Sequence, residues 1–180
     1  VDRHIPNRFE EGYGLNNQSI ERLAEQGTKV VVTVDCGIRS PREAEYAREL
    51  GVDLIISDHH FPQDVLPNAY AIICPKQAGD NYPFKELSGV GLAYKIAQAL
   101  FATRKVGDWT ADDWHDLVAL GTVSDLVPLE DENRALVRKG LQQIRYGHRV
   151  GVRALCGVSG KELSRITATD IAFGLGPRLN

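Results

Sequence analysis

Short apolar runs separated by polar segments characterise the first half of the chain. Residues 29–34 are mostly β-branched and almost wholly apolar, a pattern typical of a strand buried on both faces. Residues 52–57 form a second such run, and residues 69–74 a third. Strand–helix–strand order at this short spacing indicates parallel strands joined by crossover helices.

Helix signals mark the segments between and after these runs. Ser40, Pro41 and Glu43 combine a capping box with proline at the first helical position. After Pro83 the pattern becomes helical, and a second capping box begins at Thr110. The predicted helices cover residues 16–26, 41–50, 90–102, 110–125, 131–146, 149–156 and 168–174. The sequence thus predicts an α/β fold, a parallel sheet with crossover helices followed by a mostly helical part. No repeat or low-complexity linker interrupts it, which favours one continuous domain.

Composition narrows the class of protein. Hydrophobic residues make up 43% of the 180 residues and charged residues 25%, which excludes wholesale disorder and a disulfide-held miniprotein. No apolar stretch approaches the ~20 residues of a membrane span, and no signal peptide opens the chain. The net charge of −3 argues against a basic nucleic-acid-binding module. Cys36, Cys74 and Cys156 are odd in number and form no Cys-x-x-Cys pair, so we expect reduced thiols in a cytoplasmic protein.

Two predicted strands end in residues that can bind metal ions. Asp35 directly follows residues 29–34, and Asp58, His59 and His60 directly follow residues 52–57. Ligands of open parallel sheets bind beyond the carboxyl ends of the strands, so we expect these side chains at one edge. Carboxylates and imidazoles without thiolates suit Mn²⁺ or another first-row divalent ion.

Simpler interpretations remain open for each candidate. Asp35 alone is equally well explained as a turn former or helix N-cap. Adjacent histidines cannot both face one core, so at least one imidazole should point at the cleft or at solvent. Cys36 raises zinc as a minor alternative, weakened because no second cysteine is near. Asp125 ends the apolar residues 119–124, where we expect burial and therefore pairing or metal binding. The alternative for Asp125 is a helix-terminal residue that points to water.

With these motifs in this order, the chain resembles the DHH phosphoesterase family. The DHH tripeptide is residues 58–60, preceded by Val-Asp-Cys-Gly at residues 34–37. Further segments resemble the single-strand-specific exonucleases of that family, and together they span essentially the whole chain: residues 5–15, 87–95, 119–129 and 176–180. The tripeptide alone is weak support, whereas the ordered set is specific.

The resemblance implies a metal-ligand set. Asp35 corresponds to a carboxylate that bridges two metal ions. His59 corresponds to an imidazole that ligates the second metal, and Asp125 to the carboxylate that completes its coordination shell. The implied cofactors are two ions of Mn²⁺ or Mg²⁺.

The resemblance also implies residues that act on the substrate. His60 corresponds to a histidine that contacts the scissile phosphate, and Asp58 would orient the histidine pair. Arg178 corresponds to an arginine that grips the nucleic-acid backbone. Gly89 and Gly91 would allow close backbone approach beside the cleft.

One motif of the family is missing from these 180 residues. An Asp-x-Asp-x-Asp-Gly run does not occur, and in the family it would precede Val1. The family pattern would also continue after Asn180 into a second, substrate-binding domain. We therefore expect residues 1–180 to be the central part of one DHH catalytic domain, without the first-motif segment and the C-terminal substrate-binding domain.

The implied activity is metal-dependent hydrolysis of phosphodiester bonds in single-stranded DNA. The family resemblance indicates a 5′-to-3′ exonuclease of DNA repair and recombination, cytoplasmic and not associated with membranes. A single-strand-binding protein is a candidate partner. The isolated chain is expected to be inactive, because the Asp-x-Asp-x-Asp-Gly motif is missing.

Three other functions are weighed against this one. A DHH phosphodiesterase for short oligonucleotides or cyclic dinucleotides is disfavoured by residues 5–15 and 176–180. A catalytically silent replication scaffold would lose metal ligands, whereas Asp35, His59 and Asp125 are present. A nucleotide-binding Rossmann domain would need Gly-x-Gly-x-x-Gly after the first predicted strand, and that run is absent.

Overall fold

The computed structural model describes residues 1–7, 9 and 12–179, and the chain divides into two compact units. The first unit is Val1–Lys85 and the second is Glu86–Asn180. The boundary falls just after Pro83, where the sequence pattern turns helical. Residues 8, 10 and 11 of the family-like segment 5–15, and residue 180 of segment 176–180, lie outside the described residues. That both units belong to one DHH catalytic domain stays a prediction.

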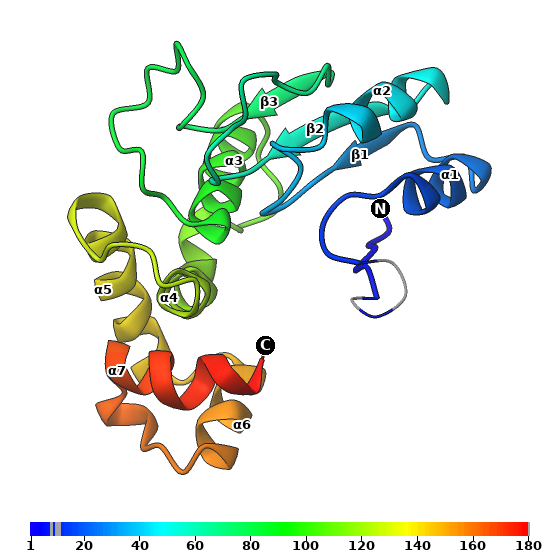
Figure 1. Cartoon of the computed structure of the whole chain (residues 1–180). Coiled ribbons are helices and arrows are strands. Elements are labelled where there is room, and N and C mark those ends of the chain that lie inside the picture. The colour runs from blue at the N-terminus through cyan, green and yellow to red at the C-terminus, as the bar shows by residue number, and fades with distance from the viewer. Residues whose placement is uncertain (8, 10–11, 180) are drawn as a thin grey trace. The chain divides into compact units, whose positions relative to one another are not determined.

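The first unit is built on a three-stranded parallel sheet (Figure 1). Its strands lie in the order β1 (Val30–Val32), β2 (Asp53–Ser57) and β3 (Ala71–Ile73). Two helices precede and follow β1, namely α1 (Asn17–Glu25) and α2 (Pro41–Glu49). Together with the helical second unit, this confirms the predicted α/β fold class, a parallel sheet with crossover helices followed by a mostly helical part.

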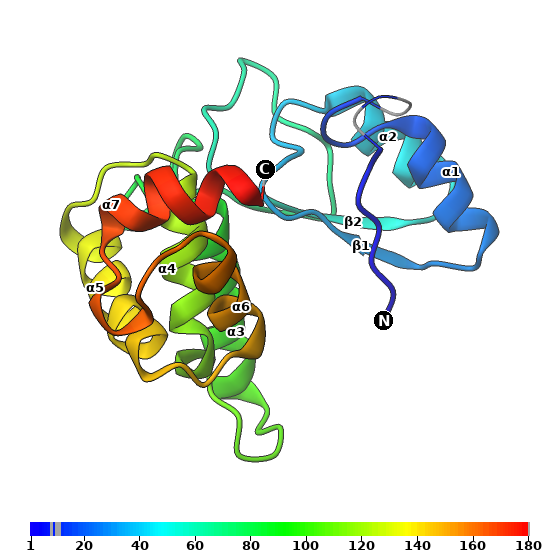
Figure 2. The same cartoon turned by 90° about the horizontal axis from the view of Figure 1, so that it is seen from below.

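Helices α1 and α2 cover one face of the sheet (Figure 2). The buried residues of this layer come from both helices, from β2 and from the residue before it: Ile20, Ala44, Ala47, Val52, Leu54 and Ile56. At 25 cal/mol per Å², each large side chain buried in this way contributes about 1.5–3 kcal/mol to folding. This layer therefore fixes β2, whose carboxyl end carries the DHH tripeptide.

Two local predictions for the first unit are wrong. Residues 29–34 were expected to form a strand buried on both faces, but β1 lies at the edge of the sheet and only Val31 packs against the helices. Val30 and Val32 point away from the helices and are 52% and 51% exposed. At the start of α2 the Ser40 side chain makes no capping hydrogen bond, so the predicted capping box is absent. Proline at the first helical position is the feature that favours the start of the helix there.

The second unit is helical, as predicted. Its elements are α3 (Gly89–Thr103), the 3₁₀ turn η1 (Ala111–Trp114), α4 (His115–Ser124), α5 (Asp131–Tyr146), α6 (Val150–Val158), the 3₁₀ turn η2 (Leu163–Arg165), α7 (Ala168–Asp170), the π turn η3 (Ile171–Leu175) and the 3₁₀ turn η4 (Gly176–Arg178). The predicted helix over residues 110–125 is thus η1 followed by α4. Its capping box between Thr110 and Asp113 is confirmed.

Helices α4 and α5 pack closely at a glycine. A Cβ atom at Gly140 of α5 would lie 2.4 Å from the Ala119 Cβ and closer still to the His115 carbonyl oxygen of α4. The core around this contact includes Val123, Val137 and further side chains from α6 and η3. Among the described residues, no helix is long and apolar enough to cross a membrane.

Candidate metal centre

Asp35 lies just beyond β1 in a left-handed backbone conformation, with φ of 67°. Its N–H donates to the Ser57 carbonyl oxygen at 2.9 Å, so the chain is still held to β2 where it turns. The Thr33 hydroxyl donates to the Cys36 carbonyl oxygen at 2.7 Å and closes the turn. Aspartate tolerates this conformation better than most residues with a Cβ atom, which suits it to the position.

The Asp58 carboxylate organises the loops that follow β1 and β2. Asp58 is 2% exposed. One oxygen accepts from the Ile38 N–H at 2.9 Å, which ties the loop after β1 to the loop after β2. The other oxygen accepts from the backbone N–H groups of His59 and His60 at 2.8 and 3.2 Å, and from His60 Nδ1 at 2.7 Å.

These hydrogen bonds decide the charge of Asp58 and the tautomer of His60. Burial opposes ionisation, but the bonds from the Ile38 N–H and from His60 outweigh it, so the pKa of Asp58 is lowered. An ionised carboxylate can only accept hydrogen bonds, so His60 Nδ1 must carry the proton. Nε2 is then the atom that His60 offers to a ligand, the usual arrangement of a histidine oriented by a carboxylate.

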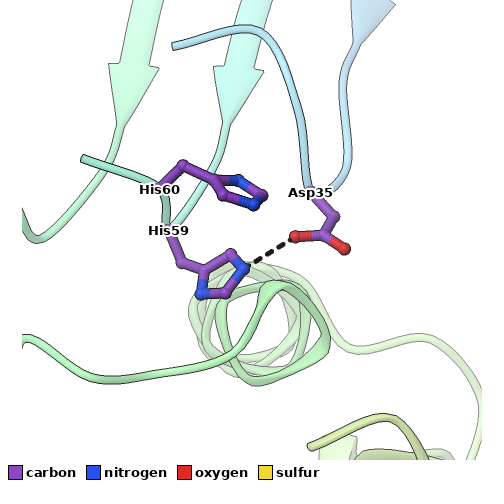
Figure 3. A group of neighbouring side chains, drawn as sticks. All are labelled: Asp35, His59 and His60. Carbon is purple, nitrogen blue, oxygen red and sulfur yellow. Dashed lines mark ion pairs between the residues drawn. The ribbon is translucent and has the colours of Figure 1, made fainter. Parts of the chain in front are cut away.

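Asp35, His59 and His60 converge beyond the carboxyl ends of β1 and β2 (Figure 3). One ligand atom from each lies within 4.8 Å of the others. Asp35 Oδ1 and His59 Nε2 are 3.0 Å apart. The Asp35 Oδ1 atom is buried, and the contact with His59 Nε2, drawn as an ion pair in Figure 3, does not meet hydrogen-bond geometry. A buried carboxylate oxygen that faces an imidazole nitrogen in this way suits a shared cation.

The two histidines differ in exposure. His59 is 6% exposed, whereas the His60 side chain is 42% exposed, and their ring centroids are 4.5 Å apart. One of the two adjacent imidazoles therefore reaches solvent, as predicted from the sequence. His60 is the histidine that an incoming ligand can reach first.

The residues present do not favour a zinc site with Cys36. The ligand group found among the described residues contains no cysteine. Carboxylate and imidazole ligands fit Mn²⁺ well. Mg²⁺ prefers oxygen ligands, so of these side chains it would be bound mainly by the carboxylate.

The remaining predicted site residues belong to the second unit. Asp125 is the C-cap of α4, and its N–H donates to the Gly121 carbonyl oxygen at 2.9 Å. The residue is exposed, so the burial expected at the end of residues 119–124 is wrong, and its position fits the alternative of a helix-terminal residue. Its role as a metal ligand stays a prediction.

Arg178 and the two glycines occupy helix ends. Arg178 is exposed in η4 and its guanidinium donates to the Gly174 carbonyl oxygen at 2.6 Å. Gly89 and Gly91 are buried in the first turn of α3, where the Gly91 N–H donates to the Ser88 hydroxyl at 3.1 Å. The predicted roles of Arg178, Gly89 and Gly91 at the substrate stay predictions.

The parallel sheet and the Asp–His–His cluster define the class of protein. The family model "DHH family, N-terminal domain" matches residues 1–122. The chain belongs to the DHH family, which confirms the resemblance drawn from its motifs.

Within that family, the chain is similar to the single-stranded-DNA-specific exonuclease RecJ. It is 46% identical to RecJ of Bacillus subtilis over its whole length, and 43% identical to RecJ of Escherichia coli. It covers 22% and 33% of these relatives, so it spans a third or less of their length. A crystal structure of exonuclease RecJ bound to manganese matches 98% of the chain at 34% identity and a TM-score of 0.84, and the chain covers 44% of that structure. RecJ of Thermus thermophilus in complex with Mn²⁺ matches with a TM-score of 0.76 at 30% identity.

Proposed function

We propose that this chain is part of a metal-dependent exonuclease that degrades single-stranded DNA from the 5′ end, in DNA repair and recombination. The main support for the proposal is the convergence of Asp35, His59 and His60 beyond adjacent parallel strands. Similarity to RecJ over the whole chain supports the substrate class. A cytoplasmic location and a single-strand-binding protein as partner belong to the same proposal.

In this function Asp35 and His59 would hold the metal, and Asp125 would complete the ligand set. Manganese or magnesium bound there would lower the pKa of a water molecule and neutralise charge on the phosphoryl oxygens. His60, held at Nδ1 by Asp58, would contact the scissile phosphate through Nε2, and this hydrogen bond requires a proton on Nε2 as well, because phosphate oxygens only accept. Asp58 is a positioning residue, since both its oxygens are occupied by Ile38, His59 and His60.

The substrate and the direction of cleavage can be tested in the intact protein that contains this chain. Purified protein is incubated with Mn²⁺ and single-stranded DNA labelled at either end. Mononucleotides should be released first from the 5′ end, and double-stranded DNA should remain intact. Asp35→Asn should abolish release, whereas Asp53→Asn, which removes an exposed carboxylate at the amino end of β2, should not.

Two outcomes would contradict the proposal. Preferential hydrolysis of dinucleotides or cyclic dinucleotides over long single strands would identify a small-substrate DHH phosphodiesterase. Binding of single-stranded DNA with no hydrolysis at any Mn²⁺ concentration would identify a silent scaffold.

A further inference from the structure

An exposed aromatic ring borders the candidate metal centre. Phe61 directly follows His60 and is 64% exposed. A single exposed apolar residue needs no explanation by itself. The surroundings of Phe61, however, differ from those of a ring that merely projects into water.

Two cationic side chains contact Phe61 from neighbouring loops. The Arg39 Nε donates to the Phe61 carbonyl oxygen at 2.8 Å, and the Lys76 Nζ lies 4.6 Å from the centroid of the ring. Arg39 follows β1, Phe61 follows β2 and Lys76 follows β3. The loops after all three strands therefore meet at Phe61, with Arg39 at its backbone and Lys76 at its ring, at the carboxyl edge of the sheet.

The backbone on either side of Phe61 is held in place. The Ile38 N–H, one residue before Arg39, donates to the same Asp58 carboxylate that orients His60. The Cys74 thiol donates to the His60 carbonyl oxygen at 3.6 Å. The hydrogen bonds that position the metal ligands therefore also fix the backbone of Phe61. A group stacked on the ring would be held at a constant position relative to the candidate metal centre.

We propose that Phe61 stacks against a nucleobase next to the phosphodiester bond held at the metal centre, with Arg39 and Lys76 attracting the flanking phosphates. This proposal rests on the proposed function. Phenylalanine offers only an apolar face, and stacking on such a face tolerates every base, as degradation of arbitrary sequence requires. The two cations supply local positive charge to a chain whose net charge is −3.

A binding measurement separates stacking from a general surface effect. Fluorescence anisotropy is measured with the intact protein, Mn²⁺ and labelled single-stranded DNA whose phosphorothioate linkages resist cleavage. The DNA carries a normal or an abasic nucleotide at each of the two positions that flank the terminal phosphodiester bond. Phe61→Ala should weaken binding of normal DNA by about 5- to 150-fold, the range measured for one stacked base. Phe61→Trp should retain binding.

The abasic DNA provides the decisive comparison. Wild-type protein should lose affinity for DNA that is abasic at one of the two positions, and Phe61→Ala should then cause no further loss. A full additional loss in that combination, or equal binding by wild type and Phe61→Ala, would overturn stacking. Tyr70→Ala is the matched control. Tyr70 is 73% exposed and directly precedes β3, so it lies at the amino ends of the strands, away from Phe61 at their carboxyl ends.

Failure of this inference can be told apart from failure of the proposed function. If the wild type cleaves single-stranded DNA, Asp35→Asn does not, and Phe61→Ala binds normally, only stacking is wrong. If the wild type with Mn²⁺ does not cleave single-stranded DNA, the proposed function itself is wrong.

Discussion

Asp35 combines a chemical role with a backbone constraint. With φ of 67° it adopts the left-handed conformation, which costs about 1 kcal/mol or more for most residues with a Cβ atom but less for aspartate and asparagine. Replacing Asp35 by alanine therefore removes the carboxylate and adds backbone strain, whereas asparagine removes only the charge. The pair of variants separates chemistry from folding.

We predict that Asp35→Asn and Asp35→Ala both lower kcat of the intact protein by about 10³-fold or more. At 1.36 kcal/mol per tenfold, this corresponds to the loss of about 4 kcal/mol of transition-state stabilisation. Only Asp35→Ala should also lower the free energy of unfolding, by about 1 kcal/mol. Steady-state kinetics and urea titration measure the two effects, and kcat within tenfold of wild type in Asp35→Asn would exclude Asp35 as a metal ligand.

The two histidines should separate metal affinity from turnover. His59 is buried against Asp35, whereas His60 is half-exposed and held by Asp58. We predict that His59→Ala weakens Mn²⁺ binding by isothermal titration more than His60→Ala does, while His60→Ala lowers kcat at saturating Mn²⁺. The reverse order of Mn²⁺ affinities would make His60 the stronger ligand.

At the scale of elements, local signals account for most helices and for the parallel strands. Asn16 caps α1 through the Ser19 N–H, and the Thr110 capping box starts η1, because both signals act within one turn. The prediction that β1 is buried on both faces is wrong because the exposure of a strand depends on its neighbours in the sheet. The pattern of apolar residues does not show which strands those neighbours are. The cluster of Asp35 with the DHH histidines could be predicted from sequence, because these residues directly follow two predicted strands that are parallel.

Other parts of the site had no local signal. Phe61, Arg39 and Lys76 are unremarkable in sequence, and only the convergence of three loops brings them together. The hydrogen bond from the Ile38 N–H to Asp58 joins residues 20 positions apart and depends on the backbone course of the loop after β1. Such contacts follow from tertiary structure and not from residue type.

The close contact of α4 and α5 at Gly140 yields a stability prediction. Alanine there would gain helix propensity but would force its Cβ against the Ala119 Cβ and the α4 backbone, so overpacking should dominate. We predict that Gly140→Ala destabilises the protein by about 1–3 kcal/mol, which lowers Tm by about 3–10 °C. Gly151→Ala in α6, where a Cβ atom meets nothing within 4 Å, should be neutral or stabilising. Calorimetry of both variants measures this, and equal Tm values would contradict the packing argument.

At the scale of the whole molecule, the ligands present limit what these 180 residues can do alone. Among the described residues, one group of three ligand side chains is found, and the sequence contains no Asp-x-Asp-x-Asp-Gly run. Two-metal hydrolysis needs two ions that act on the attacking and leaving oxygens. A net charge of −3 further weakens attraction to a polyanion, so single-stranded DNA should bind weakly and with strong salt dependence.

We predict that the isolated 180-residue chain binds at most one Mn²⁺ ion tightly and releases little or no nucleotide from single-stranded DNA. With only one ion held, hydroxide generation and leaving-group stabilisation cannot both be supplied, so turnover should fall far below that of the intact protein. Isothermal titration gives the stoichiometry, and end-labelled DNA at millimolar Mn²⁺ gives the activity, with Asp35→Ala as the control for a contaminating nuclease. Turnover within about tenfold of the intact protein, abolished by Asp35→Ala, would mean that the ligands within these 180 residues suffice for catalysis and that the two-metal assignment is wrong.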